Sequence, residues 1–390
     1  MLYPVMPVFL KHIGFSIIFI GVLEGVAEAV AGLSKSYFGK WSDQTGKRLP
    51  FVQFGYSLSA ISKPMLAFFI FPAWIFFART IDRIGKGLRT GARDAMLSDE
   101  STKETKARVF GFHRSMDTLG AVIGPCITLA YLHFNPYDYT TLFLVAFVPG
   151  LFAVFSTFLI REKKRPVVNH ENLSVERISL HFFSTISTYW KASSPTYKKL
   201  VTGLLAFALF NSADIFLLLK MKENGLNDEA IIEVYIFYNL VYALVAYPTG
   251  MIADRIGLKK ILLFGLVLFA IVYAGFAFNQ SIFIYYLLFA GYAIYAAATE
   301  SISRAWISNL VDKNETATAI GTYAGLQSFA ALVASSMAGI LWYYFGAAAT
   351  FLISACVAIA VVVYLAMGIQ YSSPLQQDDS LFKEQNTWDR

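Results

Sequence analysis

The chain is a succession of long apolar runs separated by short polar stretches. Each run is close to the roughly 20 residues that a helix needs to cross the hydrocarbon core of a bilayer. The pattern therefore predicts a series of membrane-spanning helices. We place them at residues 16–38, 51–70, 73–96, 108–132, 139–160, 200–220, 229–252, 261–278, 281–304, 317–343 and 347–370.

A shorter apolar segment, "MLYPVMPVFLKHIG", precedes these eleven spans. It would reach only about 21 Å as a helix, and Pro4 and Pro7 would bend it. We interpret it as the second half of a spanning helix whose first half is absent, which gives twelve helices in the complete design. The alternative is an interfacial anchor or a short re-entrant segment.

Composition supports a membrane protein, because 56% of residues are hydrophobic and only 15% are charged, against about 25% in soluble domains. The net charge of +6 comes from basic residues gathered in alternate short loops. This is the positive-inside pattern, so those loops are expected in the cytoplasm, and nucleic acid is not an expected partner.

Residues for covalent or metal chemistry are sparse. Cys126 and Cys356 lie far apart in apolar runs, and the five histidines lack zinc-site spacing. The stretch "GKGLRTG" lacks the order of a phosphate-binding loop. We find no nucleophile–base constellation, so the sequence predicts no enzyme, cofactor or metal site.

The two halves of the chain share a loop pattern. The stretch "GKWSDQTGKR" at 39–48 matches "GMIADRIGLK" at 250–259 with a constant offset of 211 residues. A duplicated six-helix unit explains this offset. The predicted parts are an N-terminal bundle at 1–160, a cytoplasmic linker at 161–199 with an amphipathic helix, a C-terminal bundle at 200–371, and a cytoplasmic tail at 372–390.

These repeated loops resemble the signature of the major facilitator superfamily. "RTIDRIGKG" is similar to its fourth-helix motif through Arg79, Gly85 and Gly87, although Arg83 replaces the usual glycine. "GAVIGP" resembles the fifth-helix motif of its antiporters, with the later glycines missing. The matching residues of that motif are Gly120, Gly124 and Pro125.

The resemblance implies an all-α membrane protein with the major facilitator fold, built from two pseudo-symmetric six-helix bundles. It implies alternating access around a central cavity, export rather than import, and a bacterial plasma membrane. The similar proteins form a prokaryotic branch of mostly unassigned substrate. The bilayer, a small-molecule substrate and protons are the expected partners, and a monomer is expected.

The loop pattern also has a physical interpretation. Asp43 and Asp254 end helices, where they can cap or pair with cationic neighbours. Glycines at 39 and 250 allow close helix approach, and those at 46 and 257 permit a tight turn. We interpret the pattern as a latch between states, and the alternative is a loop that only sets topology. The candidate gating residues are Gly39, Asp43, Gly46, Arg48, Arg93, Asp99, Gly250, Asp254, Arg255 and Gly257.

The fourth predicted helix carries seven charges in "RTIDRIGKGLRTGARDA", within an arc of about 140°. Charges at bilayer depth must face protein or water, so this face is expected to meet a cavity or ionic partners. The candidate substrate and coupling residues are Glu24, Glu28, Lys63, Arg79, Asp82, Arg83, Lys86, Arg89, His113, Asp117, Asn211, Asp214 and Glu300.

Among these, Glu24 and Glu28 stack one turn apart, which suits a proton acceptor, unless basic partners neutralise both. His113 and Asp117 could relay a proton or form a fixed hydrogen bond. Lys86 and Arg89 lie deepest in the stripe and are expected to contact the carboxylates or an anionic substrate. Packing is the favoured role for Tyr235, Tyr238, Tyr242 and Tyr292, with cavity lining as the alternative.

The sequence therefore predicts a proton-coupled exporter of a small anionic or amphiphilic organic solute. A metal-ion or siderophore exporter is an alternative, because Glu24, Glu28 and Asp117 could supply oxygen ligands. A non-transporting sensor or scaffold of the same fold is another.

Overall fold

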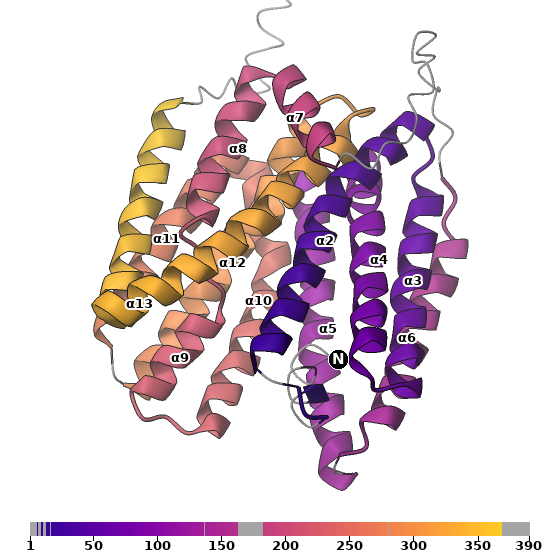
Figure 1. The fold of residues 1–390 in the computed structure, drawn as a ribbon. Coiled ribbons are helices and arrows are strands. Elements are labelled where there is room, and N and C mark those ends of the chain that lie inside the picture. The colour runs from indigo at the N-terminus through magenta and orange to yellow at the C-terminus, as the bar shows by residue number, and fades with distance from the viewer. Residues whose placement is uncertain are drawn as a thin grey trace, which may run out of the picture.

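The computed structural model describes residue 6 and residues 9–10, 13–15, 17–135, 137–162, 182–279 and 281–368. All regular structure in these ranges is helical (Figure 1). The helices form two groups that lie side by side, with α2 and α5 of one facing α10 and α13 of the other. The first group is α2 (Ile17–Thr45), α3 (Leu49–Phe68), α4 (Pro72–Asp99), α5 (Lys106–Phe134) and α6 (Tyr139–Phe158).

The second group begins after a short helix, α7 (Phe182–Ala192), which packs on α2 and α13. Its last helix, α13, contains two spans joined at Gly346, where a φ of 81° interrupts the helix. Here a glycine is needed because this backbone region is costly for other residues. The remaining helices are α8 (Pro195–Ala208), α9 (Ile215–Glu223), α10 (Asp228–Ile256), α11 (Leu258–Phe278), α12 (Ile282–Asn309) and α13 (Thr316–Gly368).

The predicted spans agree with these helices with one exception. The span at 200–220 was expected to be continuous, and this is wrong: the helix ends at Ala208 and restarts at Ile215. Counting α8 with α9 as one span and α13 as two, the described residues supply eleven.

Three predicted segments fall wholly or partly outside the described residues. From the first 14 residues, Phe9 packs against Tyr139 with ring centroids 5.4 Å apart, and most of the others lie outside. The linker helix is described only from Phe182 onward. The predicted tail at 372–390 lies entirely outside the described residues.

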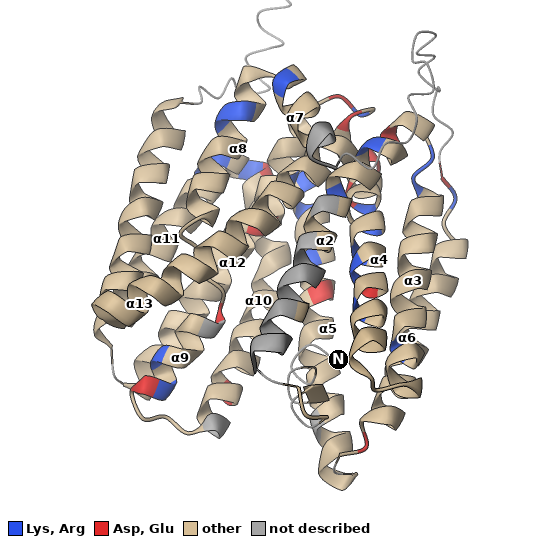
Figure 2. Ribbon diagram, in the orientation of Figure 1, with Lys and Arg blue, Asp and Glu red and all other residues tan. Residues whose placement is uncertain are grey.

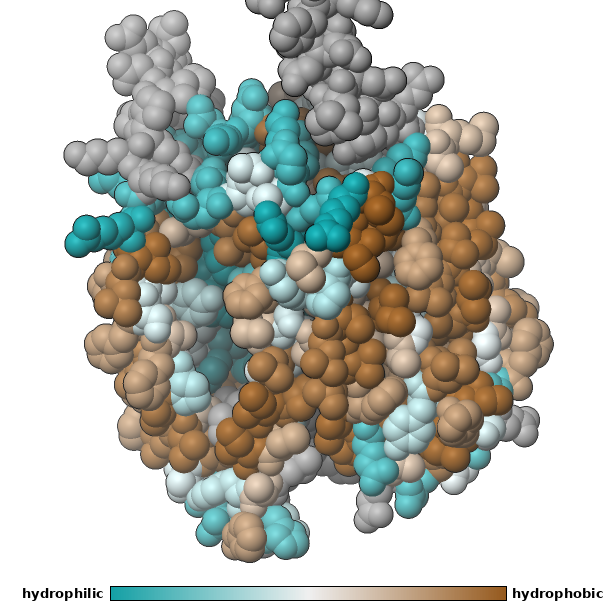
Figure 3. Space-filling model, turned by 180° about the vertical axis from the view of Figure 1, so that it is seen from behind, coloured by the Kyte–Doolittle hydropathy of each residue, from teal (hydrophilic) through white to brown (hydrophobic). Residues whose placement is uncertain are grey.

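Large apolar side chains cover the flanks of the molecule (Figure 3). Phe152 of α6 and Leu244 of α10, for example, are 69% and 67% exposed. So wide an apolar surface is unfavourable in water, whereas it is compatible with contact to lipid tails. Among the described residues, α5, α6, α11, α12, α13 and the segment 230–256 are long and apolar enough to cross a membrane.

Basic and acidic residues gather at the end of the molecule that carries the α2–α3 and α10–α11 loops, and along α4 (Figure 2). We call this end the loop-motif side.

Glycines bring backbones together at both contacts between the groups. A Cβ added to Gly39 of α2 would lie 2.4 Å from the carbonyl oxygen of Ala317 in α13. A Cβ added to Gly250 of α10 would lie 2.5 Å from the carbonyl oxygen of Ala107 in α5. Gly46 and Gly257 have φ angles of 63° and 105°, so the expected tight turns are also present.

We therefore expect Gly39→Ala to push α2 away from α13. Overpacking of this kind costs about 1–3 kcal/mol, so the melting temperature of the purified protein should fall. A disulfide between Ser36→Cys and Thr322→Cys, whose hydroxyls are 3.1 Å apart, should form in the parent and in lower yield in the variant. Cys126 and Cys356 are changed to serine throughout.

Gly120→Ala is the matched control, because a Cβ there meets no atom within 4 Å. Equal cross-linking yields and melting temperatures in the two glycine variants would contradict the proposed close approach.

Candidate functional site

Two carboxylates connect the groups of helices on the loop-motif side. Asp43, near the end of α2, accepts hydrogen bonds from the backbone N–H of Thr318 at 2.7 Å and from its hydroxyl at 2.8 Å. Asp254, near the end of α10, accepts from the backbone N–H groups of Ala107 and Arg108, both at 2.9 Å. Each acid thus binds the N-terminus of a helix from the other group, where free N–H groups and the helix dipole favour an anion.

Arg48 holds the first of these carboxylates in place. Its guanidinium lies 3.2 Å from Asp43, contacts Asp99, and donates to the carbonyl oxygen of Lys313 at 2.6 Å. The Arg48 side chain is fully buried, so these contacts replace its lost hydration. Arg255, another predicted gating residue, is exposed in the last turn of α10.

A second layer of contacts lies one to two helical turns deeper. Asp94 of α4 pairs with Arg93 at 2.8 Å and with Arg304 of α12 at 3.3 Å. At the start of α5, next to the Asp254 contact, Lys106 donates to the carbonyl oxygen of Ser308, near the end of α12, at 2.7 Å. Together with the two acid–helix contacts, these bonds close the loop-motif side of the molecule.

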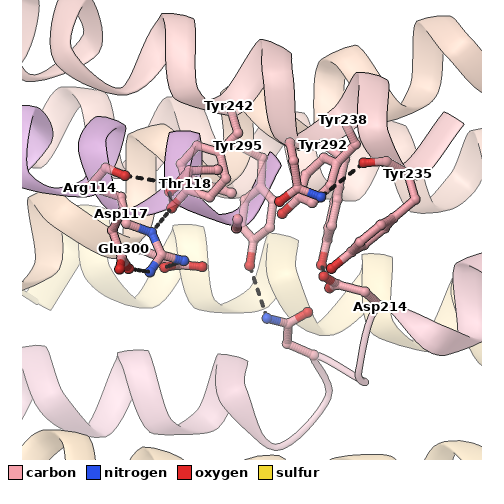
Figure 4. A pocket seen from close by; sticks show the side chains of 14 residues that line it. Arg114, Asp117, Thr118, Asp214, Tyr235, Tyr238, Tyr242, Tyr292, Tyr295 and Glu300 are labelled. Carbon is pink, nitrogen blue, oxygen red and sulfur yellow. Dashed lines mark hydrogen bonds and ion pairs between the residues drawn. The ribbon is translucent and has the colours of Figure 1, made fainter. Parts of the chain in front are cut away.

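Beyond this layer lies a cavity of about 280 Å³. Its walls come from α5, α10, α12 and the unwound segment between α8 and α9 (Figure 4). The lining residues are Arg114, Asp117, Thr118, Ala121, Asn211, Asp214, Tyr235, Tyr238, Asn239, Tyr242, Tyr292, Tyr295, Ala296 and Glu300.

Arg114 of α5 contacts several polar side chains at one end of this cavity. Its guanidinium lies 2.5 Å from Glu300 of α12 and 3.3 Å from Asp117. It also donates to the hydroxyl of Tyr242 at 2.7 Å and sits over that ring, 5.1 Å from the centroid. The Arg114–Glu300 pair therefore joins the two groups of helices across the cavity.

The other end of the cavity is formed by the break between α8 and α9. The carboxylate of Asp214 accepts a hydrogen bond from the hydroxyl of Tyr292 at 2.7 Å. Asn211 donates from its amide to the hydroxyl of Tyr295 at 3.0 Å. The break in the helix thus lies at the cavity, and it carries two of the polar side chains that line it.

Four of the predicted substrate and coupling residues line the cavity: Asp117, Asn211, Asp214 and Glu300. His113 lies within electrostatic range of Asp94 and Asp117. The antiporter-like residues Gly120, Gly124 and Pro125 lie in α5, outside the lining. The side chains of Glu24 and Glu28 lie outside the described part of the chain.

The basic stripe of α4 does not line this cavity, and its described contacts are with ionic and aromatic partners. Lys63 pairs with Asp82 at 2.8 Å, and the Arg89 guanidinium lies over the Tyr56 ring, 4.4 Å from its centroid. Arg79 and Arg83 are buried, and Lys86 lies on the same helix. The lining of the cavity described has one arginine and three carboxylates, so contact of Lys86 or Arg89 with an anionic substrate stays a prediction. Helix α4 packs mainly on α2 and α3 and also contacts α13 and α12 of the second group.

The sequence analysis does not identify Arg114 as a site residue, and it favours a packing role for the tyrosines that line the cavity. Arg114 stands three residues before Asp117, a spacing that allows ion pairing on one helix face. The tyrosines at 235, 238 and 242 recur at helical spacing on α10. Tyr238 and Tyr242 are buried, yet all three tyrosines line the cavity.

Comparison with known proteins gives a consistent picture. The sequence matches the Major Facilitator Superfamily over residues 1–227 and again over 200–385. It is 30% identical to an uncharacterized MFS-type transporter of Methanocaldococcus jannaschii, over 88% of this chain and 84% of that protein. It is 25% identical to an uncharacterized protein of Mycobacterium bovis, over 86% and 80%.

Among solved structures, the human organic anion transporter MFSD10 (TETRAN) superposes with a TM-score of 0.72. The superposition covers 92% of this chain and 87% of that one. At 16% sequence identity, this similarity shows the fold alone.

Because Arg114 and Glu300 share a half-buried ion pair, removing either alone should leave the other charge without its partner. We expect Arg114→Gln and Glu300→Gln each to lower the free energy of unfolding by about 1–3 kcal/mol. The double variant should lose much less than the sum of the two, as measured by thermal unfolding of the purified protein. The pair Lys220–Glu223, three residues apart on α9 at 3.3 Å, is the control within a single helix and should show a coupling of about 0–1 kcal/mol. Additive losses for Arg114 and Glu300 would contradict the pair.

Proposed function

We propose, on the premise that this chain belongs to the major facilitator superfamily of membrane transporters, that it exports a small organic solute in exchange for protons. The observation that carries the proposal is the cavity between the two groups of helices, bridged by Arg114 and Glu300 and closed on the loop-motif side. A cavity between two bundles, with contacts that join the bundles on the loop-motif side, suits alternating access.

The proposed orientation places the loop-motif side in the cytoplasm of a bacterial cell, with the protein in the plasma membrane. Support comes from the basic residues of the α2–α3 and α10–α11 loops, such as Lys47 and Lys260. The linker and both termini lie on the same side in this arrangement, and the transporter acts as a monomer.

The Arg114 cluster offers a physical route for coupling. Glu300 and Asp117 both compete for one guanidinium. A proton that neutralises Glu300 weakens the contact between α5 and α12, and it therefore favours separation of the two bundles. Solute and proton then act on the same equilibrium, which is the requirement for exchange. Glu24, Glu28 and His113 are the further candidate proton carriers.

Two alternative functions involve other chemistry. A metal-ion or siderophore exporter would need a cluster of oxygen, nitrogen or sulfur ligands. Among the described side chains, no group of three His, Cys, Asp or Glu residues is placed to hold a metal ion. A sensor or scaffold of the same fold would bind without moving solute, and a flux measurement distinguishes it from a transporter.

The test starts with a thermal-shift screen of the purified protein against metabolites, drugs and metal ions. Each hit is then assayed in proteoliposomes under an imposed pH gradient. In inside-out vesicles, we expect an acidic interior to drive uptake of the compound only when the hit is an organic solute. Flux of no hit under any gradient would refute the transporter proposal in favour of a sensor, and flux of a metal ion alone would favour the metal exporter.

For proton coupling, we expect Glu24→Gln and Glu28→Gln to abolish movement driven by the pH gradient while solute–solute exchange continues. Exchange needs no net proton movement, so it separates loss of coupling from loss of the fold. Glu223→Gln, an exposed acid on α9, is the matched control and should keep both activities. Unchanged coupling in both test variants would remove these two residues from the mechanism.

A further inference from the structure

We infer that the cavity binds an organic cation, with a substituted ammonium group placed between the carboxylate of Asp214 and the faces of the surrounding tyrosines. This inference rests on the proposed function, since it names the class of solute for the same cavity. It differs from the anionic substrate that the sequence alone favours.

The first argument is the charge of the cavity wall. The lining has one basic residue, Arg114, against Asp117, Asp214 and Glu300. Arg114 is already engaged by two carboxylates and the hydroxyl of Tyr242. An anionic solute would have to displace these partners, whereas a cation meets a wall with excess negative charge.

The second argument is the position of Asp214. Among the described residues, no lysine, arginine or histidine nitrogen lies within ion-pair distance of its carboxylate, which accepts a bond from the hydroxyl of Tyr292. The other two acids of the cavity share Arg114. A recessed carboxylate without a counter-charge is costly, and a bound cation would supply the missing charge.

The third argument is the arrangement of the aromatic rings. Tyr238 lies 5.3 Å from Tyr292 between ring centroids, and Tyr292 lies 5.2 Å from Tyr295. Tyr235 continues the row, 6.0 Å from Tyr238 (Figure 4). Electron-rich ring faces attract alkylammonium groups, and a cage of several rings is how proteins recognise quaternary ammonium ions.

A polar acceptor completes the site. The amide nitrogen of Asn211 is used by Tyr295, but its buried Oδ1 has no hydrogen-bond donor in the described part of the chain. A buried amide oxygen without a donor is unusual, and it adds a further negative partial charge beside the cavity. The volume of about 280 Å³ is at the small end for ligand pockets, which favours a compact cation.

The experiment uses the full chain in lipid nanodiscs and three probes of similar size. Phenyltrimethylammonium carries a positive charge, tert-butylbenzene is its neutral isostere, and benzenesulfonate carries a negative charge. We expect the cation to bind at least ~10-fold more tightly than either of the others, because charge and ring faces both favour it. This comparison needs no variant, so it does not depend on whether a substitution folds.

Substitutions then locate the site. Asp214→Asn should weaken binding of phenyltrimethylammonium ~10-fold or more. Tyr292→Phe keeps the ring and should retain most of the affinity. Glu223→Gln, which removes one acidic side chain outside the cavity, is the control and should leave the affinity unchanged. Tighter binding of benzenesulfonate, equal binding of tert-butylbenzene, or an unchanged affinity in Asp214→Asn would each overturn the inference.

A flux measurement in proteoliposomes separates this inference from the proposed function. If benzenesulfonate moves under a pH gradient and the cation does not, the protein is a transporter and the cation inference fails. If the cation binds in an Asp214-dependent manner and no solute moves, the cation site stands and the transport proposal fails.

Discussion

The contact between a carboxylate and a helix N-terminus is the interaction on which the arrangement of this protein depends. Asp43 and Asp254 each reach across to the first free N–H groups of a helix in the other bundle. The two contacts are related by the internal repeat, so they act on the two sides of one interface. They hold the bundles together at the loop-motif side, and this places Arg114 opposite Glu300.

The bilayer explains why charge is handled so differently in the two bundles. Charges at that depth need partners, and those of α4 find them on both sides: Asp82 pairs with Lys63 of α3, and Asp94 pairs with Arg304 of α12. The second bundle carries few charges and instead lines its cavity with tyrosines, whose hydroxyls need only single partners. The result is a polar cavity displaced toward the second bundle.

The spans and the tight turns of the two loops could be predicted from the sequence, because hydrophobic length and a repeat at fixed offset both persist without tertiary context. The partners of Asp43 and Asp254 in the other bundle could not be predicted. Nor could the cavity. Which face of α4 meets the other bundle depends on how that helix is rotated, and periodicity alone does not determine this. The unwinding after Ala208 was also missed, because "LFNSADIF" contains no glycine or proline to signal it. Arg114 joins the two bundles only through its pair with Glu300, which lies 186 residues away in the chain and cannot be recognised as its partner from the sequence.

The glycines at the interface have a kinetic consequence. Where Gly39 meets Ala317 and Gly250 meets Ala107, one backbone lies directly on another with no side chain between them. Ordering a long side chain costs up to about 2 kcal/mol in rotamer entropy, whereas glycine and alanine have none to lose. Along these two lines the bundles could therefore part and rejoin without ordering any rotamers. The entropy of long side chains is confined to the polar contacts between the bundles, such as Arg48 with Lys313 and Arg114 with Glu300.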